Sequence, residues 1–203
     1  ADDVPFDFWC EVRAEMEASN PQPLLVAEGE RPDDTHFAFD ANYNWPVCQR
    51  AITKILRNPE KYRQEKGGAA YIRECHEKYA ATLPEGALNW NMTENHDWAS
   101  DAYHNRAEKK YGHTNRELGL ALCFALDGVP LLYNGQEICD TCRHSIFSTP
   151  GACCIDWRQK ESVQAACRME AIKKWMKIRN DYSCMHYGRT LWIDNDNIER
   201  VCS

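Results

Sequence analysis

Short apolar runs alternate with helical segments along most of this chain of 203 residues. A strand buried on both faces of a parallel sheet reads as a continuous apolar run, without the alternation of a half-exposed strand. Such runs predict strands at residues 24–27, 87–92 and 129–133, and the aromatic-rich residues 37–45 can hold another. Strands that alternate with helices indicate a parallel sheet covered by helices, so we expect an α/β fold.

Three helical segments stand out from the rest. Residues 6–19 read as a first helix, and residues 115–126 as a nearly all-apolar helix, which implies that it is buried. Residues 162–182 read as a last long helix. Four of its residues recur at helical spacing and are expected to face the core: Ala171, Trp175, Ile178 and Tyr182.

Polar residues cluster directly after the expected strands, which is where (β/α)8 barrels build their active sites. This alternation alone does not separate a barrel from a doubly wound sheet. The sequence contains no GxGxxG and no GxxxxGK[ST] loop, which weighs against the nucleotide-binding versions of either fold.

Charge and hydropathy exclude some classes of partner. The formal net charge is −7, which argues against nucleic acid, because phosphate binding needs clustered Lys and Arg. The longest apolar stretch, residues 118–126, is far shorter than the roughly 20 residues that a membrane-spanning helix needs. We therefore expect neither a nucleic-acid partner nor a membrane partner.

The cysteines indicate a reducing compartment. There are 11, and an odd number of irregularly spaced cysteines would leave an unpaired thiol in a secreted protein. Cys139-x-x-Cys142 followed by Cys153-Cys154 suggests a zinc site, but the spacing to the second pair is irregular, so we expect no metal ligand. A cytoplasmic location is favoured. The chain does not open with a signal peptide, and one would lie upstream of Ala1.

Two acidic residues are expected at the ends of strands. Glu28 follows the run at 24–27, and Asp97 follows the run at 87–92. A pair of carboxylates across a cleft is what glycoside hydrolysis needs. The alternatives are a solvated loop residue for Glu28 and a helix cap for Asp97. Glu30 shares the strand parity of Glu28, but Glu28 ends the apolar run directly and is preferred.

Four blocks of this sequence carry a family resemblance. They are ADDVP at 1–5, LVAE at 25–28, NHD at 95–97 and GVPLLYNGQE at 128–137. In this order and spacing they resemble the α-amylase family, glycoside hydrolase family 13, from just after its fourth barrel strand to its eighth. The resemblance implies that residues 1–186 are the C-terminal half of a (β/α)8 TIM barrel. Residues 187–203, which change to short alternating segments, would begin a small all-β C-terminal domain.

The resemblance also implies a role for each matching residue. Glu28 would be the general acid/base, and Asp97 the carboxylate that stabilises the transition state. His96 would hydrogen-bond the sugar, and Asn95 would orient the loop. The family's nucleophile lies in a GFRxD-type segment that this sequence lacks, so we expect it immediately upstream of Ala1.

The implied function is a retaining α-glycosidase acting on α-glucans or malto-oligosaccharides, here a fragment that is inactive alone. A transglycosylase or isomerase of the same family uses the same carboxylates, and a non-catalytic amylase-like binding protein is a further alternative. We expect no cofactor in this segment. The family's usual calcium site would lie upstream, in the complete protein.

Overall fold

The structure is a computed structural model, and it describes residues 3–20, 22–65, 67–100, 106–144 and 154–193. The chain divides into two compact units. The first contains Ala1–Ile55, Pro59–Asn91 and Trp192–Ser203, and the second contains Leu56–Asn58 and Met92–Leu191.

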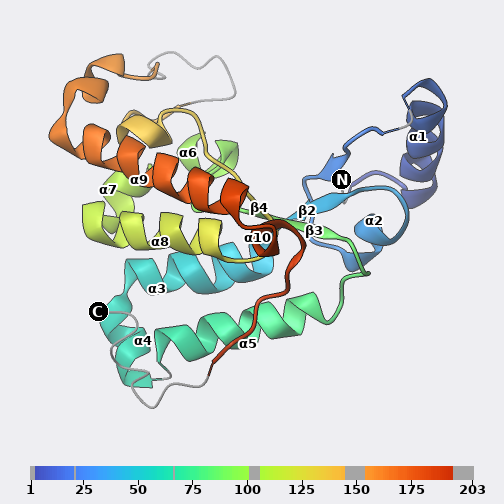
Figure 1. Cartoon of the computed structure of the whole chain (residues 1–203), viewed down its shortest axis with the longest axis horizontal. Helices are drawn as coiled ribbons and strands as arrows, with labels where there is room; N and C mark the ends of the chain where they lie inside the picture. Colours follow the sequence, from blue (N-terminus) through green and yellow to red (C-terminus); the bar gives the residue numbers. More distant parts are fainter. Residues whose placement is uncertain (1–2, 21, 66, 101–105, 145–153, 194–203) are drawn as a thin grey trace. The chain divides into compact units, whose positions relative to one another are not determined.

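The first unit is built on parallel strands (Figure 1). Strand β1 (Val26–Ala27) pairs with β2 (Ala41–Tyr43), and β2 pairs with β3 (Leu88–Asn91), both in parallel. The parallel sheet predicted from the apolar runs is confirmed for these strands. Each strand is shorter than its predicted segment and lies inside it.

Helices account for most of the remaining described residues of this unit. Their bounds are α1 Phe6–Ser19, α2 Pro32–Phe37, the π-helix η1 Trp45–Ile52, α3 Thr53–Arg57 (whose last two residues belong to the second unit), α4 Pro59–Glu65 and α5 Gly68–Ala80. Helix α1 has the predicted bounds. Its Trp9 and Val12 pack against a buried cluster that includes Leu25 and Phe39, so α1 covers the residues around β1.

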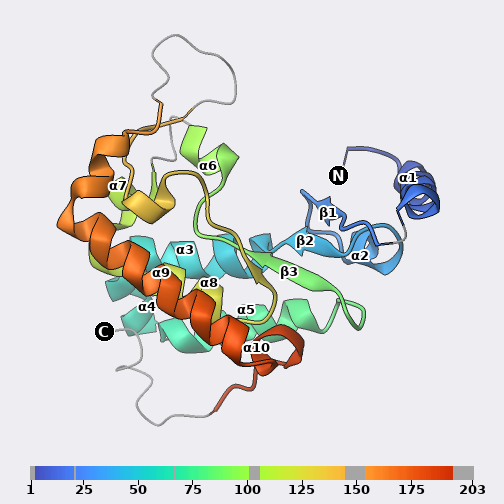
Figure 2. The ribbon, with the colours of Figure 1, turned by 45° about the horizontal axis from the view of Figure 1, so that its top comes forward.

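The second unit is mainly helical (Figure 2). Its elements are α6 His96–Ser100, α7 Ala107–Tyr111, α8 His113–Ala125, β4 Val129–Pro130, the 3-10 helices η2 Gln136–Ile138 and η3 Trp157–Glu161, α9 Val163–Asp181 and α10 Cys184–Tyr187. Helices α8 and α9 lie side by side in both views. Leu120 and Phe124 of α8 pack against Ile172 and Trp175 of α9, and this contact forms the apolar core of the unit.

The predicted inner face of the last helix is wrong in part. Tyr182 is 59% exposed and Ile178 is 39% exposed. The buried positions of α9 are Ala165, Arg168, Ile172 and Arg179. The helix is rotated from the predicted stripe because two arginines occupy its inner face, where each finds hydrogen-bond acceptors.

Two further predictions concern segments that follow α8 along the chain. The run at 129–133 forms only the short β4, because the amide of Tyr133 donates to the Gln136 side chain in a turn (2.8 Å). Residues 188–193 form no strand, and residues 194–203 lie outside the described residues, so the β-structured domain from 187 stays a prediction. Among the described residues, no helix is both long enough and apolar enough to cross a bilayer.

Candidate active site

Glu28 directly follows β1 in the first unit, and its side chain is exposed. The neighbouring carboxylate of Glu30 forms an ion pair with the guanidinium of Arg50 (Oε1 to Nη2, 2.5 Å). That contact holds Glu30 against the π-helix that follows β2. Both carboxylates follow β1, and the preference for Glu28 over Glu30 stays a prediction.

The Asn95-His96-Asp97 triplet lies in the second unit, shortly after the end of β3. The side chains of His96 and Asp97 are 31% and 50% exposed, and His96 Nε2 lies 3.3 Å from Asp97 Oδ1. The structure thus brings these two predicted site residues together at the accessible start of helix α6. An imidazole beside a carboxylate can donate a hydrogen bond to a sugar hydroxyl while the carboxylate accepts one.

Asn95 is buried and stabilises the start of α6 through its side chain. Its Oδ1 accepts a hydrogen bond from the backbone amide of Trp98 (3.0 Å), which caps the first turn of α6. A cap of this kind satisfies a backbone donor that the helix cannot satisfy itself. Asn95 therefore fixes the backbone from which His96 and Asp97 project.

The residue before the triplet is held by a buried arginine. Arg106, at the start of α7, donates from Nε to Glu94 Oε1 (2.6 Å), and both side chains are buried. The amide of Ala107 donates to the same Glu94 oxygen (2.9 Å). Arg106 also donates to the backbone carbonyls of Asn134 (2.9 Å) and Cys142 (3.2 Å). A single guanidinium thus ties the segment before the triplet to the residues after β4.

Asp140 is the second carboxylate on this guanidinium. Arg106 Nη1 lies 2.9 Å from Asp140 Oδ2, and His144 Nε2 lies 3.0 Å from the same oxygen. Burial opposes the ionisation of Asp140. The amide of Cys142, the charge of Arg106, the His144 hydrogen bond and the amide of Asp156 outweigh burial and hold its pKa below the ordinary value. Asp140 is therefore an anion at neutral pH.

Two more buried arginines lie on α8 and α9. Arg116 donates to the hydroxyl of Thr93, which also accepts from Gln136 Nε2 (3.1 Å). Arg168 donates to Glu108 Oε1 (2.6 Å), to the carboxylate of Glu117 and to the carbonyl of Gln136. Burial lowers the pKa of Arg116. Arg116 thus joins α8 to Thr93 directly, and Arg168 joins α9 to Thr93 through Gln136.

The predicted site residues thus divide between the two units: Glu28 lies in the first, and Asn95, His96 and Asp97 lie in the second. The sequence reasoning missed the buried ion pairs of Arg106. Its partners are 12 and 34 residues away, and an arginine in a polar segment reads as a surface residue. The block at 128–137 was the one available signal, because the carbonyl of Asn134 and the side chain of Gln136 both join this network.

A group inside the second unit combines the residue types that bind metals. It consists of Glu108, His113 and Cys139, whose potential ligand atoms all lie within 4.8 Å of one another. The group uses none of the residues that the sequence predicted for catalysis.

Comparisons with known proteins agree with the resemblance. No protein-family model matches the sequence, and no curated protein gives a significant match. Among solved structures, the chain is similar to a cyclic α-maltosyl-(1→6)-maltose hydrolase from Arthrobacter globiformis, with a TM-score of 0.72 and 20% identity over 95% of this chain and 42% of that one. It is also similar to a noncanonic maltogenic α-amylase from Thermotoga neapolitana, with a TM-score of 0.70 and 22% identity over 97% of this chain and 42% of that one.

A third similar structure is a variant of AmyP in complex with maltotriose, with a TM-score of 0.64 and 15% identity over 95% of this chain and 48% of that one. The chain spans less than half the length of each of these three proteins. The likeness establishes that the chain has part of the fold of amylase-type enzymes. The resemblance inferred from the sequence is confirmed at that level.

Proposed function

We propose that this chain is the C-terminal half of the catalytic barrel of a retaining α-glycosidase, acting on α-glucans or malto-oligosaccharides. Nearly the whole chain has the fold of amylase-type enzymes. The maltotriose bound to AmyP supports an oligosaccharide of this kind as the substrate class. The length of the similar proteins supports a fragment, with the remaining part of the site on sequence outside these residues.

One observation carries the proposal. Strands β1 and β3 belong to the same parallel sheet, so their carboxyl ends lie at the same edge. Glu28 follows β1 directly, and the Asn95-His96-Asp97 triplet begins four residues after β3 ends. In barrels of parallel strands, residues that follow the carboxyl ends build the active site. Exposed acidic side chains at both positions are what glycoside hydrolysis requires.

In the proposed mechanism, Glu28 protonates the glycosidic oxygen as the bond to the leaving group breaks. Asp97 accepts hydrogen bonds from the sugar and stabilises the positive charge that develops on its ring. His96 donates to a sugar hydroxyl, and Asn95 positions both residues through the cap of α6. Retention of configuration requires a nucleophile about 5 Å from the acid/base. The chain contains no GFRxD-type segment, so we assign the nucleophile to sequence outside it.

The test compares substitutions in the complete protein on two substrates, an α-glucan and an activated aryl α-glucoside. Glu28→Gln should lower turnover of the glucan about 10²- to 10⁴-fold, the usual contribution of a general acid. It should spare the glycosylation step of the aryl glucoside, whose leaving group needs little protonation. Asp97→Asn should impair both substrates, because it acts on charge at the sugar itself.

Glu30→Gln is the matched control, because Glu30 has the same side chain two residues further along and is held by Arg50. It should leave turnover nearly unchanged. Normal glucan turnover in Glu28→Gln would show that the acid/base assignment is wrong. If the complete wild-type protein binds maltotriose and turns over neither substrate, it is a binding protein and the proposed activity fails.

A further inference from the structure

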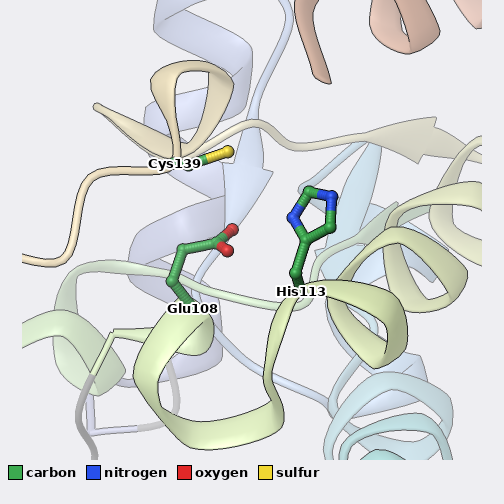
Figure 3. A group of neighbouring side chains, drawn as sticks. All are labelled: Glu108, His113 and Cys139. Carbon is green, nitrogen blue, oxygen red and sulfur yellow. The ribbon is translucent and has the colours of Figure 1, made fainter. Parts of the chain in front are cut away.

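Three side chains of different chemistry point toward one another in the second unit (Figure 3). Glu108 comes from α7, His113 is the first residue of α8, and Cys139 follows η2. A carboxylate oxygen, an imidazole nitrogen and the sulfur lie within 4.8 Å of one another. The three residues are separated by other sequence and share no motif, which is why no metal ligand was predicted from spacing.

The donor set defines the class of ion. Thiolate and imidazole ligands favour Zn²⁺ and similar soft ions, whereas Ca²⁺ and Mg²⁺ prefer sites built from oxygen alone. Ligands of a tetrahedral zinc ion are roughly 3.5 Å apart, given bonds of about 2.0–2.3 Å. Since no separation in the group exceeds 4.8 Å, the ligand atoms need to approach by at most about 1.3 Å. His113 can supply this movement, because its side chain is 45% exposed and Gly112 precedes it.

The backbone at Cys139 is held in an unusual conformation. Its φ is +60°, in the left-handed region, and it is the one non-glycine residue with a positive φ among those that the structure describes. A residue with a Cβ pays a conformational cost there, and such strain clusters at binding sites. The turn from Gly135 to Asp140, closed by the hydrogen bond from Asp140 N to Gly135 O (2.9 Å), maintains this conformation. It presents the sulfur toward His113.

The arginine side chains next to the group are compatible with a bound cation. Arg168 and Arg116 both approach Glu108 through Oε1, at 2.6 and 3.7 Å, so the described ion pairs leave Oε2 for a metal. Burial raises the pKa of Cys139 to about 11, whereas the charge of Arg168 favours the thiolate. Attraction between Arg168 and a metal-bound thiolate would offset the repulsion between Arg168 and the cation.

We propose that Glu108, His113 and Cys139 bind a soft divalent metal ion such as Zn²⁺, with water in the fourth position. The bonds formed are from the metal to sulfur, nitrogen and oxygen, and the thiol proton is released to the buffer. The ion would join α7, the start of α8 and the turn after η2. This site is separate from the proposed catalytic residues, so its existence does not depend on the proposed function.

The experiment titrates this chain with Zn²⁺ alone by calorimetry and follows alkylation of each cysteine by mass spectrometry. We expect one equivalent of zinc to bind with release of a proton. Zinc should slow alkylation of Cys139 in the wild-type chain, a result that needs no substitution. Cys139→Ser and His113→Ala should weaken binding by more than about 100-fold, beyond the effect of losing an outer-shell partner.

Cys142→Ser is the control, because Cys142 lies three residues after Cys139 but outside the group. It should bind zinc as the wild-type chain does. If Cys142→Ser abolishes binding, zinc uses the Cys139-x-x-Cys142 pair and the proposal is wrong. It is also overturned if zinc leaves Cys139 alkylation unchanged, or if Cys139→Ser binds as tightly as the wild-type chain. Circular dichroism of each variant verifies that it is folded.

Discussion

Replacing Arg106 with methionine should severely destabilise the second unit. The guanidinium makes hydrogen bonds of 2.6 Å to Glu94 and 2.9 Å to Asp140, and all three side chains are buried. Methionine fills much of the same volume but leaves both carboxylates without their counter-charge. Removing one partner of a buried ion pair costs about 3–5 kcal/mol, so the free energy of unfolding should fall by at least that range. In a chain of this size the loss corresponds to roughly 6–20 °C in Tm.

The loss of stability in Arg106→Met should depend on pH. The lowered pKa of Asp140 means that its stabilising contribution is present above the unfolded carboxyl pKa of about 3.9 and is lost as pH falls through the folded value. In Arg106→Met, protonation relieves the penalty of burying the carboxylates without a partner. The difference in unfolding free energy between wild type and variant should therefore be largest near neutral pH and shrink on acidification.

Urea unfolding followed by tryptophan fluorescence measures this difference at several pH values. Arg158→Met is the control, because Arg158 pairs with Asp156 at the surface and its side chain is 90% exposed. That variant should unfold with nearly the wild-type midpoint. The reasoning is refuted if Arg106→Met costs less than about 1 kcal/mol, the range of a surface pair, or if its deficit grows on acidification.

Three other predictions follow from single contacts. Asn95→Ala removes the cap of α6 and should cost about 0.5–2 kcal/mol in urea unfolding, whereas Asn95→Ser should restore most of it. Gly119→Ala places a Cβ 2.6 Å from Leu56 Cδ1, so it should cost about 1–3 kcal/mol unless Leu56 changes rotamer, which a mutant crystal structure would reveal. Without added metal, iodoacetamide should modify Cys139 far more slowly than the exposed Cys184, because Cys139 is buried and burial raises its pKa. Mass spectrometry measures both rates, and equal rates would contradict the burial of Cys139.

The sequence also predicts that the cysteines form no disulfide framework. Among the residues that the structure describes, the cysteines form no disulfide; they lie at positions 10, 48, 75, 123, 139, 142, 154, 167 and 184. We expect mass spectrometry of the unreduced complete protein to detect no defined set of bridges. Several defined bridges would contradict the reducing compartment that the cysteine count favoured.

The sequence predicted those helices and strands whose position depends on residues close together in the chain. Helix α1 occupies the predicted residues, β1 and β3 fall inside their apolar runs, and β2 falls inside the aromatic-rich segment, because these features depend on nearby residues. The inner face of α9 could not be predicted in the same way. Arg168 and Arg179 are buried there only because acceptors from distant segments surround them, and hydropathy counts such residues as exposed.

The same contrast between nearby and distant residues applies to the candidate site. The order of the blocks containing Glu28 and Asp97 was available from the sequence, because a resemblance depends on residues that stand together. The contacts around Asp140 were not available, because its partners come from positions 106, 142, 144 and 156. The ion pair between Glu30 and Arg50 was also not available, because the two residues are 20 positions apart.

The hydrogen bonds of Arg179 have a consequence for synthesis of the chain. Arg179 donates to the carbonyls of Phe124 (2.9 Å) and Gly128 (2.5 Å), which lie at and beyond the last turn of α8. A ribosome makes α8 first, and 55 residues separate Phe124 from the arginine that completes its end. During translation these carbonyls must remain hydrated until α9 has left the exit tunnel. Docking of α9 onto the end of α8 is therefore a late event in the synthesis of the chain.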